Sequence, residues 1–175
     1  MLDSANTAQL NFLPTRLRTG LGYDVHALVE GRDLIIGGVH IPHEKGLDGH
    51  SDADVLTHAI SDALLGALRA GDIGKLFPDT DPAFKGLDSL KMLSDIAALV
   101  RKSNYEIVDI DSVVAAQEPK ISPYREQMRK NLANAMEVSL DSVGVKATTT
   151  EKLGFEGRKE GISAYATCLI CRCCD

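Results

Sequence analysis

The chain has 175 residues, of which 25% are charged and 44% hydrophobic, and its formal net charge is −6. This length and composition predict one soluble globular domain. No apolar run approaches the roughly 20 residues that a membrane span needs. The excess of acidic residues also argues against a general nucleic-acid-binding surface, so we expect neither a membrane nor a nucleic acid as a partner.

All four cysteines, Cys168, Cys171, Cys173 and Cys174, lie in the last eight residues. They cannot cross-link distant parts of the chain, so no disulfide framework is expected and a reducing compartment is favoured. We expect the bacterial cytoplasm, with a plastid-type organelle as the alternative. A zinc knuckle at Cys168-x-x-Cys171 is a weaker alternative, because there is no second pair of this kind.

Residues 1–15 are polar and contain no Lys or Arg, which is typical of neither a signal peptide nor a full transit peptide. We expect a disordered leader there, with an additional docked strand as the alternative. The folded domain is expected over residues 16–172, followed by a short tail over residues 173–175.

A strand is predicted over residues 17–28, with Gly20 and Gly22 at points where another backbone or a ligand can come close. Side chains i and i+2 of a strand point to the same face, so Asp24 and His26 are expected to stand side by side. This Asp-x-His pair offers half of a metal site.

A hairpin is predicted from residues 34–36 and 39–41, because Gly37-Gly38 provides the positive φ of a tight turn. The glycine-interrupted loop that follows leads to His50 and Ser51. We expect such a loop to be able to close over a ligand.

A core helix is predicted over residues 54–69, with Ser51 or Asp52 as its N-cap and Gly71 as its stop. His58 lies on this helix. Its imidazole, with Asp24 and His26, predicts a zinc site with three protein ligands and one open position, which is the catalytic arrangement.

Two further carboxylates flank His58 on the same helix. Asp54 and Asp62 lie four residues to either side, so we expect them to accept the second ring N–H and orient the imidazole. The alternative is that each histidine has only a structural role.

The irregular connection over residues 72–82 is long for a compact domain, which favours a functional segment. The remaining predicted elements are helices over residues 88–102 and 122–137 and strands over residues 105–116, 143–149 and 162–171.

A second chemical centre is predicted between the last two strands. Consecutive hydroxyls over residues 148–150, with Lys146, Lys152, Arg158 and three glycines, can surround phosphate oxygens, and Glu151 can hold a hard divalent cation. A solvated turn is the alternative, because exposed turns favour these residue types.

Four long motifs occur in one order: Gly-Tyr-Asp-Val-His at 22–26, His-Ser-Asp-Ala-Asp at 50–54 with His58, Gly-Asp-Ile-Gly-Lys-Leu-Phe-Pro-Asp-Thr-Asp at 71–81, and Lys-Ala-Thr-Thr-Thr-Glu-Lys-Leu-Gly-Phe at 146–155. Residues 16–172 thereby resemble the 2-C-methyl-D-erythritol 2,4-cyclodiphosphate synthases of the non-mevalonate isoprenoid pathway. The resemblance implies a single α+β catalytic domain, with a β-sheet packed against about three helices, in a cyclic homotrimer with active sites between neighbours.

The resemblance also implies roles for individual residues. Asp24, His26 and His58 match the zinc ligands, Glu151 matches the ligand of magnesium or manganese, and His50 and Thr149 match catalytic positions. The implied substrate-binding residues are Asp24, Val25, His26, His50, Ser51, Asp72, Ile73, Gly74, Phe77, Pro78, Asp79, Thr80, Asp81, Ala116, Gln117, Glu118, Pro119, Lys120, Ile121, Ser122, Thr148, Thr149, Thr150, Glu151, Phe155 and Arg158.

The implied activity is that of a phosphorus–oxygen lyase. It converts 4-diphosphocytidyl-2-C-methyl-D-erythritol 2-phosphate to 2-C-methyl-D-erythritol 2,4-cyclodiphosphate and releases CMP. Two alternatives remain. One is a non-enzymatic, zinc-stabilised binding domain with His43 or His50 as a fourth ligand. The other is a phosphodiesterase that uses zinc-bound hydroxide.

Overall fold

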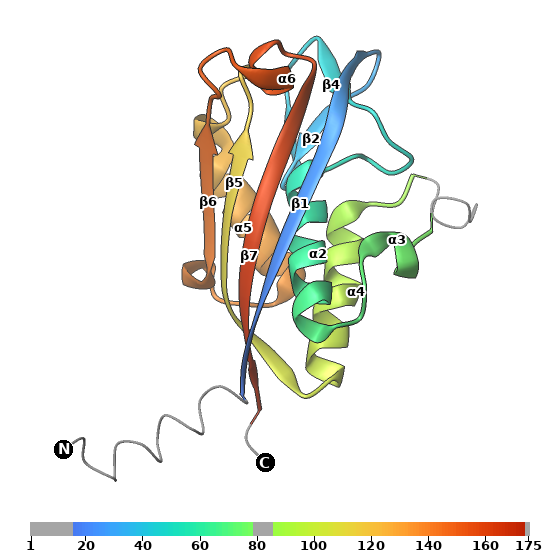
Figure 1. Ribbon diagram of the computed structural model, residues 1–175, viewed down its shortest axis with the longest axis vertical. Coiled ribbons are helices and arrows are strands. Elements are labelled where there is room, and N and C mark those ends of the chain that lie inside the picture. Colours follow the sequence, from blue (N-terminus) through green and yellow to red (C-terminus); the bar gives the residue numbers. More distant parts are fainter. Residues whose placement is uncertain (1–15, 79–85, 174–175) are drawn as a thin grey trace, which may run out of the picture.

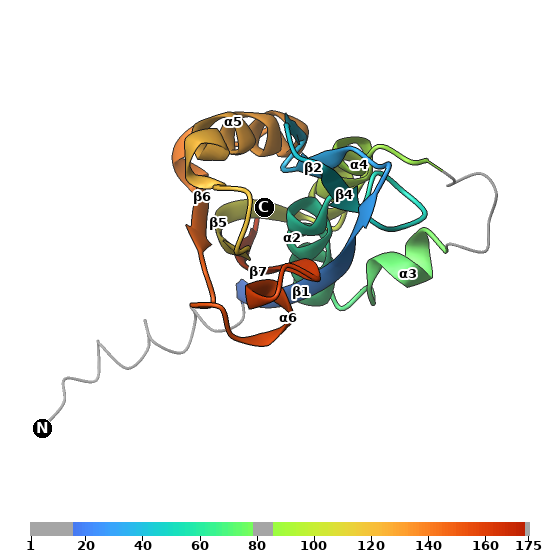
Figure 2. The same ribbon diagram turned by 90° about the horizontal axis from the view of Figure 1, so that it is seen from above.

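The computed structural model describes residues 16–78 and 86–173. The predicted leader, Asp79, Thr80, Asp81 and the last two residues lie outside the described part. A mixed five-stranded sheet with the strand order β4-β1-β7-β5-β6 forms one layer, and helices α2, α4 and α5 lie on one side of it (Figure 1, Figure 2). The predicted α+β architecture is confirmed.

The main sheet consists of β1 (Leu17–Glu30), β4 (Lys45–Leu47), β7 (Gly161–Arg172), β5 (Tyr105–Ala115) and β6 (Val143–Thr148), while β2 (Leu34–Ile36) and β3 (Val39–Ile41) form the predicted hairpin. The α-helices are α2 (Val55–Leu68), α3 (Ile73–Leu76), α4 (Ser89–Lys102), α5 (Arg125–Met136) and α6 (Gly154–Gly157). β7 is antiparallel to both β1 and β5, whereas β5 and β6 are parallel.

The predicted N-cap of the first long helix is wrong. Asp54 is the N-cap of α2, and its side chain accepts a hydrogen bond from the Thr57 N–H. Asp52 instead accepts from Ser89, and the Ser51 hydroxyl accepts from the Ala53 N–H. Ser51 therefore bonds within its own loop and Asp52 bonds to the start of α4, so neither side chain caps α2.

Two other helix boundaries differ from the prediction. Helix α2 ends before Gly71, because Arg69 adopts the left-handed conformation (φ 61°) and its N–H bonds to the Gly66 carbonyl. The third long helix is preceded by a 3-10 turn, Ser122–Tyr124, and becomes α-helical only at Arg125.

Helix α2 lies directly against β1 because β1 lacks side chains at two points. A Cβ atom at Gly20 would lie 1.8 Å from the Ala63 carbonyl oxygen, and one at Gly22 would lie 1.9 Å from the Ala59 carbonyl oxygen. The close approach that the sequence predicted at these glycines is confirmed. It brings the next positions on the same face of β1 within side-chain reach of α2.

The β2–β3 hairpin is attached to the start of α2 by one buried carboxylate. Asp54 accepts hydrogen bonds from the N–H groups of Gly37 (2.8 Å) and Gly38 (2.7 Å), whose φ angles are 57° and 65°. The hydroxyl of Thr57 is a further donor, at 2.8 Å. These bonds offset the cost of burying the Asp54 charge, although burial still raises the pKa of this group.

Cys168, Cys171 and Cys173 are free cysteines. Among the residues that the structure describes, none of the helices has the length and apolar character needed to cross a membrane.

Candidate metal and phosphate site

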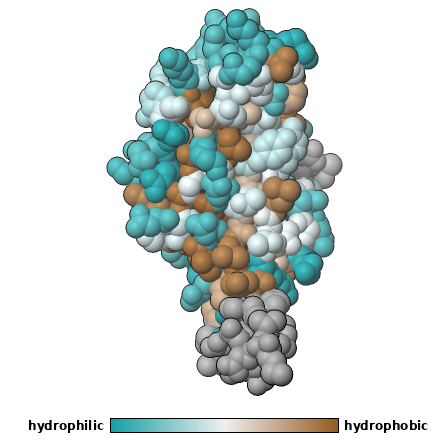
Figure 3. All heavy atoms as spheres, turned by 60° about the vertical axis from the view of Figure 1, so that its left-hand side comes forward, coloured by the Kyte–Doolittle hydropathy of each residue, from teal (hydrophilic) through white to brown (hydrophobic). Residues whose placement is uncertain are grey.

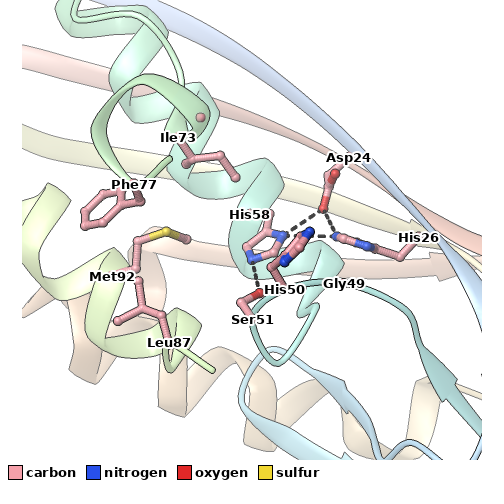
Figure 4. A pocket seen from close by; sticks show the side chains of 11 residues that line it. Asp24, His26, Gly49, His50, Ser51, His58, Ile73, Phe77, Leu87 and Met92 are labelled. Carbon is pink, nitrogen blue, oxygen red and sulfur yellow. Dashed lines mark hydrogen bonds and ion pairs between the residues drawn. The ribbon is translucent and has the colours of Figure 1, made fainter. Parts of the chain in front are cut away.

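Three side chains from two elements converge beside α2. Asp24 and His26 come from β1 and His58 comes from α2, and one ligand atom of each lies within 4.8 Å of the others. Asp24 Oδ2 is 3.0 Å from both His26 Nε2 and His58 Nδ1, and the two ring nitrogens are 3.2 Å apart (Figure 4). The strand pair and the helix histidine that the sequence singled out are therefore together in space.

The environment of His26 turns one ring nitrogen toward the cluster. Its Nδ1 atom lies 2.5 Å from the backbone carbonyl oxygen of Asp48. A carbonyl oxygen only accepts, so Nδ1 carries a proton, and Nε2 is the nitrogen that faces Asp24 and His58 and remains to bind a metal.

The charge of Asp24 reinforces this arrangement. Burial disfavours the charged carboxylate, but hydrogen bonds from His26 and His58 hold its pKa well below the usual range. Burial lowers the pKa of His26, and its bond with Asp24 more than offsets this effect, so the net shift is upward. One negative charge and converging nitrogen atoms form a donor set that fits a zinc ion with an open fourth position.

Asp54 and Asp62 do not orient His58, which corrects the prediction from helical spacing. Asp54 is occupied by the hairpin, and Asp62 accepts the Ile73 N–H at 2.8 Å. The His58 Nε2 atom instead lies 3.0 Å from the Ser89 hydroxyl and 3.3 Å from the Ser51 hydroxyl. Ser89 falls within the predicted helix over residues 88–102, and no spacing rule links it to a histidine 31 positions earlier.

The cluster opens into a cavity of about 320 Å³, within the range of small-molecule sites. His50 and Ser51 line its polar side together with the three clustered residues (Figure 4). The opposite wall is apolar and consists of Ile73, Gly74, Phe77, Leu87 and Met92. Of these, Leu87 and Met92 were not predicted.

Three other expected substrate residues of this region do not line the cavity, namely Val25, Asp72 and Pro78. Asp72 caps α3, since its side chain accepts the Lys75 N–H. Val25 points to the opposite face of β1 and is 42% exposed.

The loop that carries His50 is held by an arginine that the sequence analysis missed. The Arg32 guanidinium donates to the carbonyl oxygens of Gly49 and Ser51, each at 2.8 Å. The His50 carbonyl itself accepts the Gly86 N–H at 2.9 Å. Backbone atoms on both sides of His50 are thereby fixed, while its side chain lines the cavity.

The residues of the second predicted centre lie where two parallel strands end. Ala115 of β5 is the register partner of Thr148 of β6, so the segments that follow them leave the same edge of the sheet. The Ala116 N–H donates to the Thr148 carbonyl at 3.0 Å, and the Lys152 N–H donates to the Gln117 side chain at 3.1 Å. The predicted segments 116–122 and 148–152 therefore lie side by side.

Glu151 is presented on an exposed turn. It has a φ of 54°, and its carboxylate accepts the Thr149 hydroxyl at 2.6 Å. Two nearby cations are paired within the chain, Lys159 with Glu118 at 2.8 Å and Arg158 with Glu160 at 2.9 Å. These ion pairs are exposed, so exchanging them for phosphate costs little.

The two centres do not share a cavity in one chain. Among the described residues, none of segments 116–122 and 148–152 lines the pocket beside His58. The order β1-β7-β5-β6 puts three strand spacings between Asp24 and Thr148, or about 14 Å at about 4.8 Å per spacing.

Comparison with known proteins settles the family. The model of the YgbB family matches residues 17–171. The chain belongs to this family. A member from Desulfitobacterium hafniense, named 2-C-methyl-D-erythritol 2,4-cyclodiphosphate synthase, is 61% identical over 155 residues, which are 88% of this chain and 98% of the relative. The predicted resemblance is thus confirmed.

Solved structures of this family have the same fold. The bifunctional IspDF from Campylobacter jejuni matches with a TM-score of 0.86 and 44% identity over 89% of this chain, which spans 42% of that longer chain. IspF from Plasmodium falciparum, solved as a CDP complex, matches with a TM-score of 0.80 and 36% identity over 91% of this chain and 98% of that chain.

Proposed function

We propose that this YgbB-family protein converts 4-diphosphocytidyl-2-C-methyl-D-erythritol 2-phosphate to 2-C-methyl-D-erythritol 2,4-cyclodiphosphate, as a phosphorus–oxygen lyase of isoprenoid biosynthesis. The observation that carries the proposal is the 61% identity to a relative of that name along 98% of its length. The Asp24–His26–His58 cluster in a cavity supports it physically. The bacterial sources of the relatives favour the cytoplasm over a plastid-type organelle.

The reaction is an intramolecular phosphoryl transfer. An oxygen of the 2-phosphate forms a bond to the β-phosphorus, the bond from that phosphorus to the bridging oxygen breaks, and CMP leaves with the bridging oxygen. No water is consumed. The principal barrier is to bring two anionic phosphate groups together in line, which positioning and local positive charge can lower.

The donor chemistry of the two centres supports a different cation at each. Asp24, His26 and His58 would hold zinc, and Glu151 would hold magnesium or manganese. When bound, these ions neutralise phosphate charge and polarise the attacked phosphorus. An acidic protein, with a net charge of −6, thereby handles a polyanionic substrate without a large basic patch.

The remaining predicted residues position the substrate. His50 and Ser51 line the cavity beside the metal ligands, so they are placed to donate hydrogen bonds to phosphate oxygens. The Thr149 hydroxyl lies beside Glu151, where it can orient the diphosphate. Segment 116–122 would receive the cytosine ring, and Gly74, which lines the cavity, would border the sugar portion.

We further propose that the protein is a homotrimer whose active sites lie between neighbouring subunits. The sheet face opposite α2 exposes large apolar side chains, including Leu21 (69%), Tyr23 (43%) and Tyr165 (47%). Apolar surface also gathers low on the side of the molecule shown in Figure 3. Exposed apolar surface of this kind favours association, and each interface of a cyclic trimer can join the metal centre of one subunit to the phosphate centre of the next.

The test is to incubate the purified protein with zinc, magnesium and the cytidyl substrate, and to follow the products by phosphorus NMR. We expect the cyclic diphosphate and CMP in equal amounts. Linear methylerythritol phosphates with CMP would indicate zinc-dependent phosphodiester hydrolysis instead. Absence of turnover, with unfolding when zinc is removed, would favour the non-enzymatic zinc-stabilised domain.

A further inference from the structure

The buried edge of the His58 ring contacts Ser89, which in turn bonds to Asp52. Neither residue has a role in the proposed function. Ser89 is the first residue of α4 and is 1% exposed. Its hydroxyl oxygen lies 3.0 Å from His58 Nε2. The same hydroxyl donates to Asp52 Oδ1, and the Ser89 N–H donates to Asp52 Oδ2 at 3.1 Å.

The number of protons fixes the direction of this chain of bonds. A serine hydroxyl has one proton, and the Asp52 carboxylate can only accept it. Ser89 therefore presents a lone pair to His58, so Nε2 must carry a proton. With Nε2 committed to Ser89, Nδ1 is the nitrogen that faces Asp24 and His26 and remains to bind a metal.

The other hydroxyl near this ring is a weaker partner. Ser51 lies 3.3 Å from Nε2, and its oxygen already accepts the Ala53 N–H at 3.0 Å. Ser51 also lines the open cavity, whereas Ser89 is enclosed between α2 and α4. The structure thus singles out Ser89 as the group that holds the ring.

We propose that Ser89, held by Asp52, is a positioning residue that fixes His58 with Nδ1 directed at the metal. The inference rests on the proposed zinc site and adds to it a residue that holds one of the ligands. Partners of this kind hold the ring orientation of a ligating histidine, and their loss typically weakens metal binding about 10–100-fold. Because Asp52 follows the loop of His50 and Ser51, the same carboxylate also links that loop to the start of α4.

The first test measures zinc affinity by competition with a chromophoric chelator. Ser89→Ala should weaken zinc binding about 10–100-fold. The matched control is Ser61→Ala, because Ser61 is a fully buried serine on α2 whose hydroxyl has no hydrogen-bond partner among the described residues. It should leave zinc affinity within about twofold of wild type, since no bond to the ring is lost.

The outcomes separate the two proposals. Equal zinc affinity of Ser89→Ala and wild type would overturn the role of Ser89 and leave the proposed function intact. A wild-type protein that binds no zinc would remove the metal site itself, and the inference with it.

The second test reads the ring directly by NMR of the zinc-loaded protein with ¹⁵N-labelled histidine. The His58 ring is buried and bonded at Nε2, so its Nε2–H should give a signal that exchanges slowly with solvent. The signal is assigned by its loss in His58→Ala. It should shift and exchange faster in Ser89→Ala but stay unchanged in Ser61→Ala.

Asp52→Asn covers the case in which Ser89→Ala does not fold. An asparagine amide can donate to the Ser89 hydroxyl, which frees the serine proton to turn toward Nε2 and compete with the ring N–H. Weaker zinc binding in a folded Asp52→Asn protein supports the proposal. An unshifted Nε2–H signal with wild-type zinc affinity in that variant overturns it.

Discussion

The proposed metal centre, Asp24 with His26 and His58, and the proposed phosphate centre on the turn around Glu151 are built in opposite ways. Asp24, His26 and His58 are at least partly buried, come from two elements, β1 and α2, and are held by bonds to other parts of the fold. Glu151 lies on an exposed turn, and its carboxylate bonds to a hydroxyl only two residues away. The first centre is therefore complete in the folded subunit, whereas the second depends on what binds to it.

The two centres also differ in the stage at which their residues lose conformational entropy. The metal centre is ordered during folding, because Gly20 and Gly22 let α2 approach β1 and the core helix brings His58 with it. The exposed turn retains conformational freedom until a ligand or another subunit restricts it, and binding must offset that entropy. Substitutions at the metal centre should therefore reduce metal retention. Substitutions at the phosphate centre should instead change how activity depends on the concentrations of substrate and of added cation.

The largest expected effect is that of His58→Ala. We expect loss of zinc and a loss of activity of about 10³-fold or more, while the protein stays folded, because its core does not depend on the metal. Metal analysis, circular dichroism and a thermal melt check this. His40→Ala is the control, since His40 is exposed and pairs with the exposed Asp33. Cooperative unfolding of metal-free protein near room temperature would instead support the zinc-stabilised domain.

Glu151→Gln should show the complementary behaviour. Zinc should be retained, and activity should fall about 10²-fold, because the neutral amide holds a hard cation less well. Higher magnesium or manganese should restore part of the activity. The control is Glu126→Gln, which removes an exposed carboxylate paired with Arg129. Unchanged kinetics in Glu151→Gln would exclude this carboxylate from cation binding.

The third prediction asks whether one active site uses both centres from different subunits. His58→Ala inactivates the metal centre, and Thr149→Arg blocks the phosphate centre by bulk and charge. When equal amounts are unfolded together and refolded, about one interface in four pairs two intact halves. Activity should then rise from near zero to roughly a quarter of wild type, if the two chains assemble equally well.

The control for this experiment is to refold the two variants separately and to pool them afterwards, which should leave them inactive unless subunits exchange. Mixed trimers that are verified by mass and remain inactive would mean that each site lies within one chain.

The sequence predicted those residues of the metal centre whose positions follow from the repeat of a strand or a helix. A strand repeat of two placed Asp24 beside His26, and a helical repeat put His58 on a core helix. It misassigned Asp54 and Asp62, because spacing on one helix shows which residues are neighbours but not which backbone N–H groups compete for a carboxylate. Ser89 could not be found at all, since its contact with His58 depends on how α4 packs against α2.

Arg32 was missed for the same reason, and it gives the smallest effect that we predict. Its guanidinium bonds to the carbonyls on both sides of His50, so Arg32→Ala should loosen this loop without removing a metal ligand. We expect zinc affinity to stay unchanged and the loss of activity to remain below about tenfold, or about 1.4 kcal/mol. Faster amide hydrogen exchange over residues 49–51 should accompany that loss.

Arg32→Lys sharpens the test, because one ammonium group cannot reproduce the fork that reaches both carbonyls. The lysine variant should therefore recover only part of the activity and of the exchange protection. Loss of zinc from Arg32→Ala would show that the His50 loop supports the metal centre as well. In that case the His50 loop would belong to the preformed metal centre and not to the parts that become ordered on binding.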